Sequence, residues 1–104
     1  MPEKKLPFTH KQLDAIIDKY PTPFHIYDEK AIRKNARDFK KAFAWNKGFK
    51  EFFAVKACPN PYIMKMLQAE GFGADCSSVA ELVLSQKTGI VGEEIMFSSN
   101  DTPA

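Results

Sequence analysis

Apolar side chains alternate between two spacings along the chain, and this alternation predicts helices separated by short strands. The helical pattern, with apolar residues three or four positions apart, occurs in four stretches, each preceded by a residue that can cap a helix. These caps are Thr9, Asp28, Asn60 and Ser78. Short apolar runs bounded by turn residues predict strands at residues 24–27, 52–55, 73–76 and 95–97. The helices are expected to end at Pro21, near Gly48, at Gly71 and at Gly89.

In the second half of the chain the predicted order is strand, helix, strand, helix, strand. Each helix is long enough to connect two parallel strands, so the sequence predicts an α/β fold. Functional groups in such sheets gather at the carboxyl ends of the strands. Polar clusters follow the three strands, namely Lys56, then Asp75 with Ser77, then Ser98 to Asn100. We expect these clusters to share one face.

Lys56 is the residue with the clearest chemical potential. It directly follows residues 52–55, which have the length and the aromatic or β-branched content of an interior strand, and Pro59 and Pro61 prevent the strand from continuing. Apolar neighbours disfavour an ammonium ion, and a neutral amine attacks a carbonyl to form a Schiff base. The alternative is a lysine that extends from the strand end into water. Spacing alone leaves both interpretations open.

Composition excludes several classes of function. The chain has 104 residues, 44% of them hydrophobic, which is typical of one small globular domain. A net charge of +2 is too small to indicate nucleic-acid binding, and the basic residues between Lys30 and Lys50 are spread along the segment as on a solvated helix face. There is neither a signal-peptide core nor an apolar run of membrane-spanning length, so we expect a cytoplasmic protein without a membrane partner.

Metal, disulfide and dinucleotide sites are not predicted. Cys58 and Cys76 are far apart in the sequence without a CxxC pattern, so both are expected to be reduced thiols. His10 and His25 are isolated and are not expected to bind a metal. The glycine-containing segment that begins at Gly71 lacks the third glycine of the dinucleotide-binding motif.

Three segments taken together resemble the alanine-racemase-type pyridoxal-phosphate enzymes, and within them the decarboxylases of diaminopimelate, ornithine and arginine. The segments are Tyr20-Pro-Thr-Pro23-Phe-His-Ile-Tyr27-Asp28, Phe53-Ala-Val-Lys56-Ala and Gly73-Ala-Asp75-Cys-Ser77-Ser-Val-Ala-Glu81-Leu82. They are similar, in order, to the "TP-hydrophobic-Y-D", "YAVKAN" and "G-x-D-x-A/S-S-x-x-E-L" motifs. Cys58 replaces the usual Asn, and the sequence Pro59-Asn60-Pro61 after it resembles diaminopimelate decarboxylases. The glycine-rich continuation found in alanine racemases is absent.

The resemblance implies roles for three residues. Lys56 would bind pyridoxal 5'-phosphate covalently as a Schiff base, and it is the predicted catalytic residue. Asp75 would lie near that lysine and tune its charge and orientation, although an Asp that ends a strand in a turn is also common. Glu81 would lie near the cofactor as well, but its spacing from Ser78 is equally typical of a capping box. No metal is implied.

The resemblance also implies an architecture. Residues 29–104 would begin a pyridoxal-phosphate-binding TIM (β/α)8 barrel and contribute its first three strands, and residues 1–28 would belong with a β-rich second domain. Because such a barrel needs about 250 residues, the chain is expected to be the N-terminal portion of a longer enzyme. We expect it to be inactive alone and to associate or be unstable, and the full-length enzyme to be a homodimer.

The implied activity is decarboxylation of a basic amino acid with the cofactor as electron sink. The Thr-Pro opening and the Pro-Asn-Pro after Lys56 favour conversion of meso-diaminopimelate to lysine. Ornithine, arginine, lysine and carboxynorspermidine stay open as substrates, because residues that hold the distal end of the substrate are not in view. A non-catalytic homologue that binds pyridoxal phosphate and a stand-alone α/β binding module are the alternatives from other classes.

Overall fold

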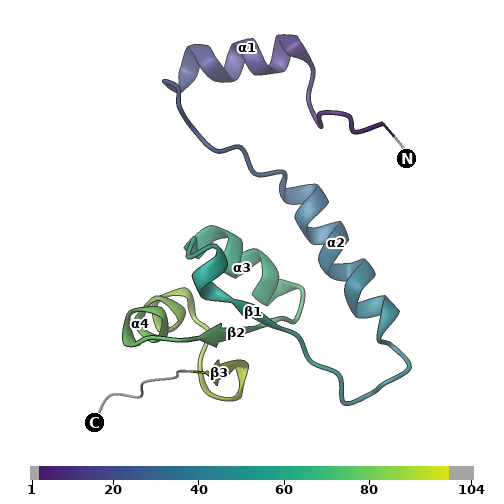
Figure 1. Cartoon of the computed structure of the whole chain (residues 1–104), viewed down its shortest axis with the longest axis vertical. Helices are drawn as coiled ribbons and strands as arrows, with labels where there is room; N and C mark the ends of the chain where they lie inside the picture. Colours follow the sequence, from purple (N-terminus) through teal and green to yellow (C-terminus); the bar gives the residue numbers. More distant parts are fainter. Residues whose placement is uncertain (1–2, 99–104) are drawn as a thin grey trace.

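The computed structural model describes residues 3–98, which form an α/β arrangement with a three-stranded parallel sheet (Figure 1). The helices are α1 (His10–Lys19), α2 (Glu29–Ala42), α3 (Pro61–Ala69) and α4 (Val79–Thr88). The strands are β1 (Phe52–Ala54), β2 (Gly73–Cys76) and β3 (Ile95–Phe97), and short 3-10 turns lie at Val55–Ala57 and Gly92–Glu94. Strand order is β1-β2-β3 with both pairs parallel, which confirms the predicted α/β fold.

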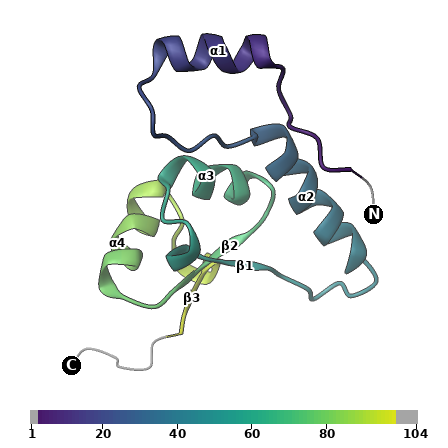
Figure 2. The same cartoon turned by 45° about the horizontal axis from the view of Figure 1, so that its top comes forward.

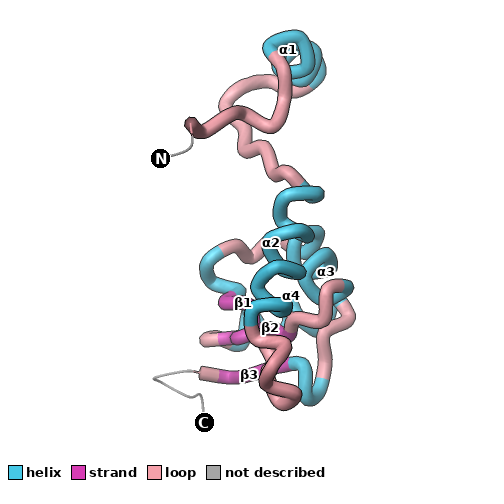
Figure 3. The backbone as a smooth tube through the Cα atoms, turned by 90° about the vertical axis from the view of Figure 1, so that its right-hand side faces the viewer, coloured by secondary structure: helices cyan, strands magenta, loops and turns pink. Residues whose placement is uncertain are grey.

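The core lies on one face of the sheet, beneath α2, α3 and α4 (Figures 2 and 3). One cluster joins α2 to α3 and Phe72, and the other joins α3, β2 and the segments around α4. The buried apolar residues are Ala36, Val55, Ile63, Met64, Met66, Leu67, Phe72, Ala74, Cys76 and Ile90. Side chains alternate along a strand, so Asp75, between buried Ala74 and Cys76, points to the opposite, open face. The sheet therefore has a closed helical face and an open face.

Local signals placed most helix ends correctly. The Thr9 hydroxyl and the Gln12 side chain form the predicted capping box at α1. The Asn60 side chain accepts hydrogen bonds from the first turn of α3, where Pro61 occupies the first position. Gly89 ends α4 with a φ of 90°, a left-handed conformation that glycine adopts without steric cost.

The predicted end of the second helix near Gly48 is wrong, because α2 ends at Ala42. The rings of Phe43 and Phe49 stack with centroids 4.4 Å apart, which requires the chain to turn back on itself between them. Asn46 stabilises this turn, since its side chain accepts a hydrogen bond from the Gly48 N–H at 3.0 Å. A ring pair formed across a loop is not visible in helical periodicity, so the sequence pattern extended the helix too far.

The N-terminal segment stands apart from the core (Figure 1). No residue of α1 is buried, and the radius of gyration is 16.7 Å, against roughly 13 Å expected for a compact domain of about 100 residues. The strand predicted at residues 24–27 is absent: these residues are assigned no regular structure and pair with no described strand. An extended segment becomes a strand only when a neighbour satisfies its backbone groups, and none of residues 3–98 does so.

Helix α2 is attached to the end of α3 by an ion-pair cluster centred on Glu70. Arg37 donates from Nε to Glu70 Oε2 at 2.8 Å and from its second amino group to Oε1 at 2.9 Å, and Arg33 donates to Oε1 at 3.1 Å. The hydrogen bonds from Arg37, followed by those from Arg33, hold the pKa of Glu70 below its ordinary value. The cluster therefore favours the ionised carboxylate in the folded chain.

Replacing Glu70 by glutamine should lower the stability of the protein at neutral pH but not in acid. Because the folded-state pKa is depressed, Glu70 contributes stability above its ordinary pKa of about 4.5 and loses it as the pH falls through the lower folded value. Urea unfolding would measure the free energy of unfolding of the parent and of Glu70→Gln from about pH 2 to about pH 7, a range that crosses that pKa. The two curves of free energy against pH should converge in acid. Glu93→Gln is the control, since no described residue donates to the Glu93 carboxylate. A difference in the free energy of unfolding between the parent and Glu70→Gln that stays constant with pH would contradict the depressed pKa of Glu70.

Candidate functional site

Lys56 lies at the carboxyl end of β1, in the 3-10 turn Val55–Ala57, and its side chain is exposed. The strand predicted at residues 52–55 is present and is one residue shorter than expected. The strand stops at Ala54, and β1 is an edge of the described sheet with half-buried side chains. Only Val55, immediately before the lysine, is completely buried. The exposed amine is compatible with both interpretations that spacing left open.

Asp75 lies near the carboxyl end of β2, the central strand, as the sequence predicted. Its Cα is in register with Ala54 of β1 and Met96 of β3, and Met96 is 49% exposed on the open face. The hydroxyl of Ser98 donates to Asp75 Oδ1 at 2.5 Å. The structure therefore brings together the second and third of the predicted polar clusters. Asn100 lies outside the described residues.

Lys56 and Asp75 end neighbouring strands without forming an ion pair. The described ion pairs all involve α2, and Lys56 takes part in none of them. The first predicted cluster thus adjoins the other two across the parallel β1 and β2 pair, while its amine has no described hydrogen-bond partner. The backbones of Lys56 and Asp75 thus lie at the same carboxyl edge of the sheet.

Glu81 lies in the first turn of α4 and is only partly a capping residue. Ser78 Oγ accepts from the Glu81 N–H at 3.3 Å, as expected, but the Glu81 carboxylate accepts from the Ser78 hydroxyl at 2.6 Å rather than from the backbone. Its Oε1 is buried without a hydrogen-bond partner among the described residues. A buried carboxylate oxygen without a partner is costly, so Glu81 retains one acceptor for a group that the described chain does not supply.

Cys76, next to Asp75, is a packing residue rather than a nucleophile. It is completely buried, and its Sγ lies 3.2 Å from the hydroxyl of Ser85. Burial, followed by the negative charges of Glu81 and Asp75, raises the pKa of the Cys76 thiol, while Ser85 opposes the shift. Both cysteines are free, as predicted.

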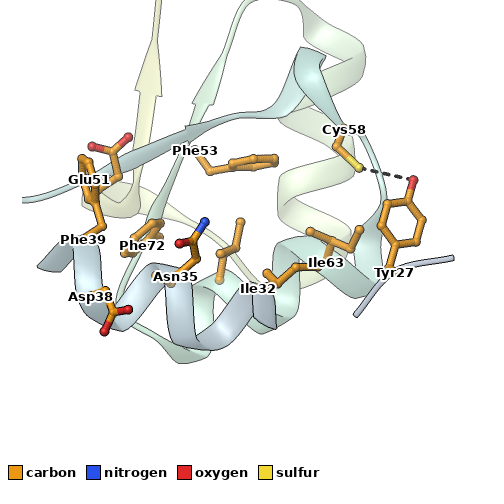
Figure 4. A pocket seen from close by; sticks show the side chains of 12 residues that line it. Tyr27, Ile32, Asn35, Asp38, Phe39, Glu51, Phe53, Cys58, Ile63 and Phe72 are labelled. Carbon is orange, nitrogen blue, oxygen red and sulfur yellow. Dashed lines mark hydrogen bonds between the residues drawn. The ribbon is translucent and has the colours of Figure 1, made fainter. Parts of the chain in front are cut away.

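A separate apolar groove of about 520 Å³ lies on the helical face, between α2, β1 and α3 (Figure 4). Ile32, Phe53 and Phe72 are among its lining residues. At one end the Cys58 Sγ lies 3.8 Å from the Tyr27 hydroxyl, and this contact raises the pKa of Tyr27. Lys56, Asp75 and Glu81 do not line the groove, so it is separate from the candidate site.

Comparison with known proteins identifies the family. Residues 29–103 match the family model for "Pyridoxal-dependent decarboxylase, pyridoxal binding domain". The chain belongs to this family. The match begins at the first residue of α2 and includes Lys56, Asp75 and Glu81. Pyridoxal, expected from the three sequence segments, is therefore confirmed as the cofactor class of this pyridoxal-binding domain.

Relatives of the pyridoxal-binding domain agree with this assignment. The chain is 50% identical over 90 residues to Protein TabA of Pseudomonas amygdali pv. tabaci, covering 86% of this chain and 21% of the relative. It is 37% identical over 87 residues to a diaminopimelate decarboxylase of Helicobacter pylori, covering 82% of this chain and 21% of the relative. It thus spans about a fifth of the length of these curated relatives.

A solved structure supports the same fold. Diaminopimelate decarboxylase from Helicobacter pylori, crystallised with L-lysine, superimposes with a TM-score of 0.72 at 34% identity, covering 84% of this chain and 22% of that one.

Within residues 3–98, no helix combines the length and hydrophobicity needed to cross a bilayer. In the same residues, no cluster of three or more His, Cys, Asp or Glu side chains could hold a metal ion.

The functional groups that the described residues leave available fit part of the cofactor. An exposed amine is available for covalent attachment, and Glu81 Oε1 is a buried acceptor that lacks a donor. Ser98, which the predicted site did not include, contacts Asp75 directly. The expectation that the polar clusters after the strands share one face signalled this neighbourhood, while the hydrogen bond itself depends on the register of β2 and β3, which residue patterns do not specify.

Proposed function

We propose that this chain supplies the cofactor-lysine region of a pyridoxal-phosphate-dependent decarboxylase that converts meso-diaminopimelate to lysine. The supporting observation is that Lys56 and Asp75 end adjacent parallel strands, within a segment that matches the pyridoxal-binding domain. The similarity to diaminopimelate decarboxylases, at 37% identity over 82% of the chain, supports the choice of substrate.

The cofactor would supply an electron sink for the pair left when CO₂ departs from the substrate. Lys56 would hold the cofactor covalently through its amine, which is exposed and without a described partner. Asp75 would favour a positive charge on the nitrogen bound there, because a nearby carboxylate stabilises a cation. Glu81 would offer its unpaired Oε1 to a donor at the cofactor. Each role uses a group that the described residues leave available.

We further propose that residues 29–104 begin a TIM barrel and that residues 1–28 belong with a second, β-rich domain. The open sheet face and the edge strand β1 are what an incomplete barrel would present. All residues of helix α1 are at least partly exposed, and the helix stands away from the core. This exposure supports the proposal that α1 packs against a segment outside the described residues. The full-length protein would then be a homodimer, as the resemblance implies.

An alternative substrate is supported by the superposition on ornithine decarboxylase from Entamoeba histolytica, with a TM-score of 0.76 at 28% identity, covering 89% of this chain and 29% of that one. The 50% identity to Protein TabA exceeds the 37% identity to the named diaminopimelate decarboxylase. The chain is thus more similar to a protein whose name gives no substrate. In this alternative the same chemistry would act on another amino acid with a basic side chain, such as ornithine, arginine or lysine.

Release of CO₂ from carboxyl-labelled amino acids would test the proposal. The intact protein, loaded with pyridoxal phosphate, should release label from meso-diaminopimelate at a kcat/KM that exceeds those for ornithine, arginine and lysine by about tenfold or more, since pockets built around a polar group discriminate strongly. Omitting the cofactor is the control. A preference for another basic amino acid would select the second substrate, and no release from any of them would contradict the proposed activity.

A further inference from the structure

Ser98 is held in place by the sheet itself. It directly follows β3, and its backbone N–H donates to the Cys76 carbonyl at 2.9 Å, which continues the hydrogen bonding between β2 and β3 beyond the strand end. Its hydroxyl donates to Asp75 Oδ1 at 2.5 Å. The donor is therefore presented from a fixed backbone position, and a hydrogen bond to an ionised acceptor is stronger than a neutral one.

The hydrogen bond from Ser98 occupies one side of the Asp75 carboxylate. Because β2 is the central strand, Lys56 follows the neighbouring strand on one side and Ser98 follows the neighbouring strand on the other. Oδ1 is bound on the Ser98 side, and no residue among 3–98 donates to Oδ2. The carboxylate thus has one fixed oxygen and one available oxygen.

We propose that Ser98 is a positioning residue, which fixes the Asp75 carboxylate so that Oδ2 is presented to the group bound at Lys56. Without this hydrogen bond the Asp75 side chain has several staggered rotamers open to it, and the position of its charge relative to a neighbour changes with the rotamer. The inference depends on the proposed function of Lys56 and Asp75. It adds a residue outside the three predicted site residues, and its basis is the geometry of the β2 and β3 pair.

The alternative role for Ser98 is to join β3 to β2 without any effect on the site. The backbone bond to Cys76 persists in any Ser98 variant except proline, so removal of the hydroxyl separates the two roles. Ser98→Thr and Ser98→Val have nearly the same shape and differ in the hydroxyl, which makes them a matched pair. Ser98→Ala is a second variant without the hydroxyl if valine is poorly accommodated.

The experiment measures the pH profile of borohydride trapping at Lys56 and the rate of cofactor dissociation in the intact, pyridoxal-phosphate-loaded protein. We expect Ser98→Thr to match the parent. In Ser98→Val and Ser98→Ala the trapping profile should move along the pH axis, and the cofactor should dissociate roughly three- to tenfold faster, as loss of one hydrogen bond to a charged group allows. Thermal unfolding of the cofactor-free proteins would separate positioning from folding defects.

Each outcome decides one proposal. If Lys56 is trapped equally in all variants, with the same pH profile and dissociation rate, Ser98 is only a structural residue and the proposed role of Lys56 survives. If the threonine variant behaves like the valine variant, the hydroxyl is not the cause and the inference is wrong. If Lys56 is not trapped in the parent protein, the proposed function fails, and the role of Ser98 at that site fails with it.

Discussion

Replacing Lys56 by alanine should abolish covalent attachment of pyridoxal phosphate to this chain. The amine is the only part of the side chain that can attack the aldehyde of the cofactor, and alanine has no substitute for it. Borohydride reduction of the intact, cofactor-loaded protein, followed by peptide mapping, should tag the peptide that contains Lys56 in the parent and give background labelling in Lys56→Ala. Decarboxylation should fall to background as well.

The control for this experiment is Lys65→Ala. Lys65 is an exposed lysine on α3 that forms no described ion pair or hydrogen bond, so its loss removes an amine without touching the strand ends. It should leave the labelling of Lys56 unchanged. Labelling of a different lysine in the parent protein would contradict the assignment of Lys56 as the attachment site, and the proposed role of Asp75 beside Lys56 would fail with it.

Replacing Gly73 by alanine should cause a large loss of stability for so small a change. A Cβ built at Gly73 would lie 2.5 Å from the Glu94 carbonyl oxygen and 2.6 Å from Cδ1 of Phe52, both shorter than real contacts. The carbonyl belongs to the backbone that leads into β3, so relief requires a shift of the sheet, at a cost of about 1–3 kcal/mol. Urea unfolding of the intact protein, monitored by circular dichroism, would measure the loss.

Gly48→Ala is the matched control for Gly73→Ala. A Cβ at Gly48 would meet only Asn46 Oδ1 at 3.5 Å, an ordinary contact, so its effect should stay within about 0.5 kcal/mol, as is usual for surface positions. Equal losses for the two variants would show that steric exclusion at β2 is not the reason for glycine at position 73. Because Gly73 lies two residues before Asp75 on the same strand, Gly73→Ala should also weaken cofactor binding.

Sequence patterns were sufficient where the deciding interaction is local. The caps at Thr9, Asp28, Asn60 and Ser78 all accept hydrogen bonds from the first turn of the helix that they begin. These bonds join residues two or three positions apart, so the residue type and its spacing determine them. The parallel α/β order was predictable from the alternation of strands and helices, because each connecting segment is long enough for the crossover that parallel strands require.

Patterns failed where a distant partner decides the outcome. Residues 24–27 have the composition of a strand, but no strand among the described residues pairs with them. Helix α2 ends at Ala42 rather than near Gly48, because Phe43 beyond it stacks on Phe49. Propensity cannot supply these contacts, because each depends on which surface another segment covers.

From residue 29 onward the sequence by itself determined the order of helices and strands and placed Lys56, Asp75 and Ser98 at strand ends, because strand length and turn residues are encoded over a few neighbouring positions. Only the tertiary structure decided that the Ser98 hydroxyl binds Asp75 and that Lys56 is exposed. The physical reason is that strand register and sheet edges arise from pairing between segments about 20 residues apart, and the sum of many backbone hydrogen bonds and core contacts selects that pairing.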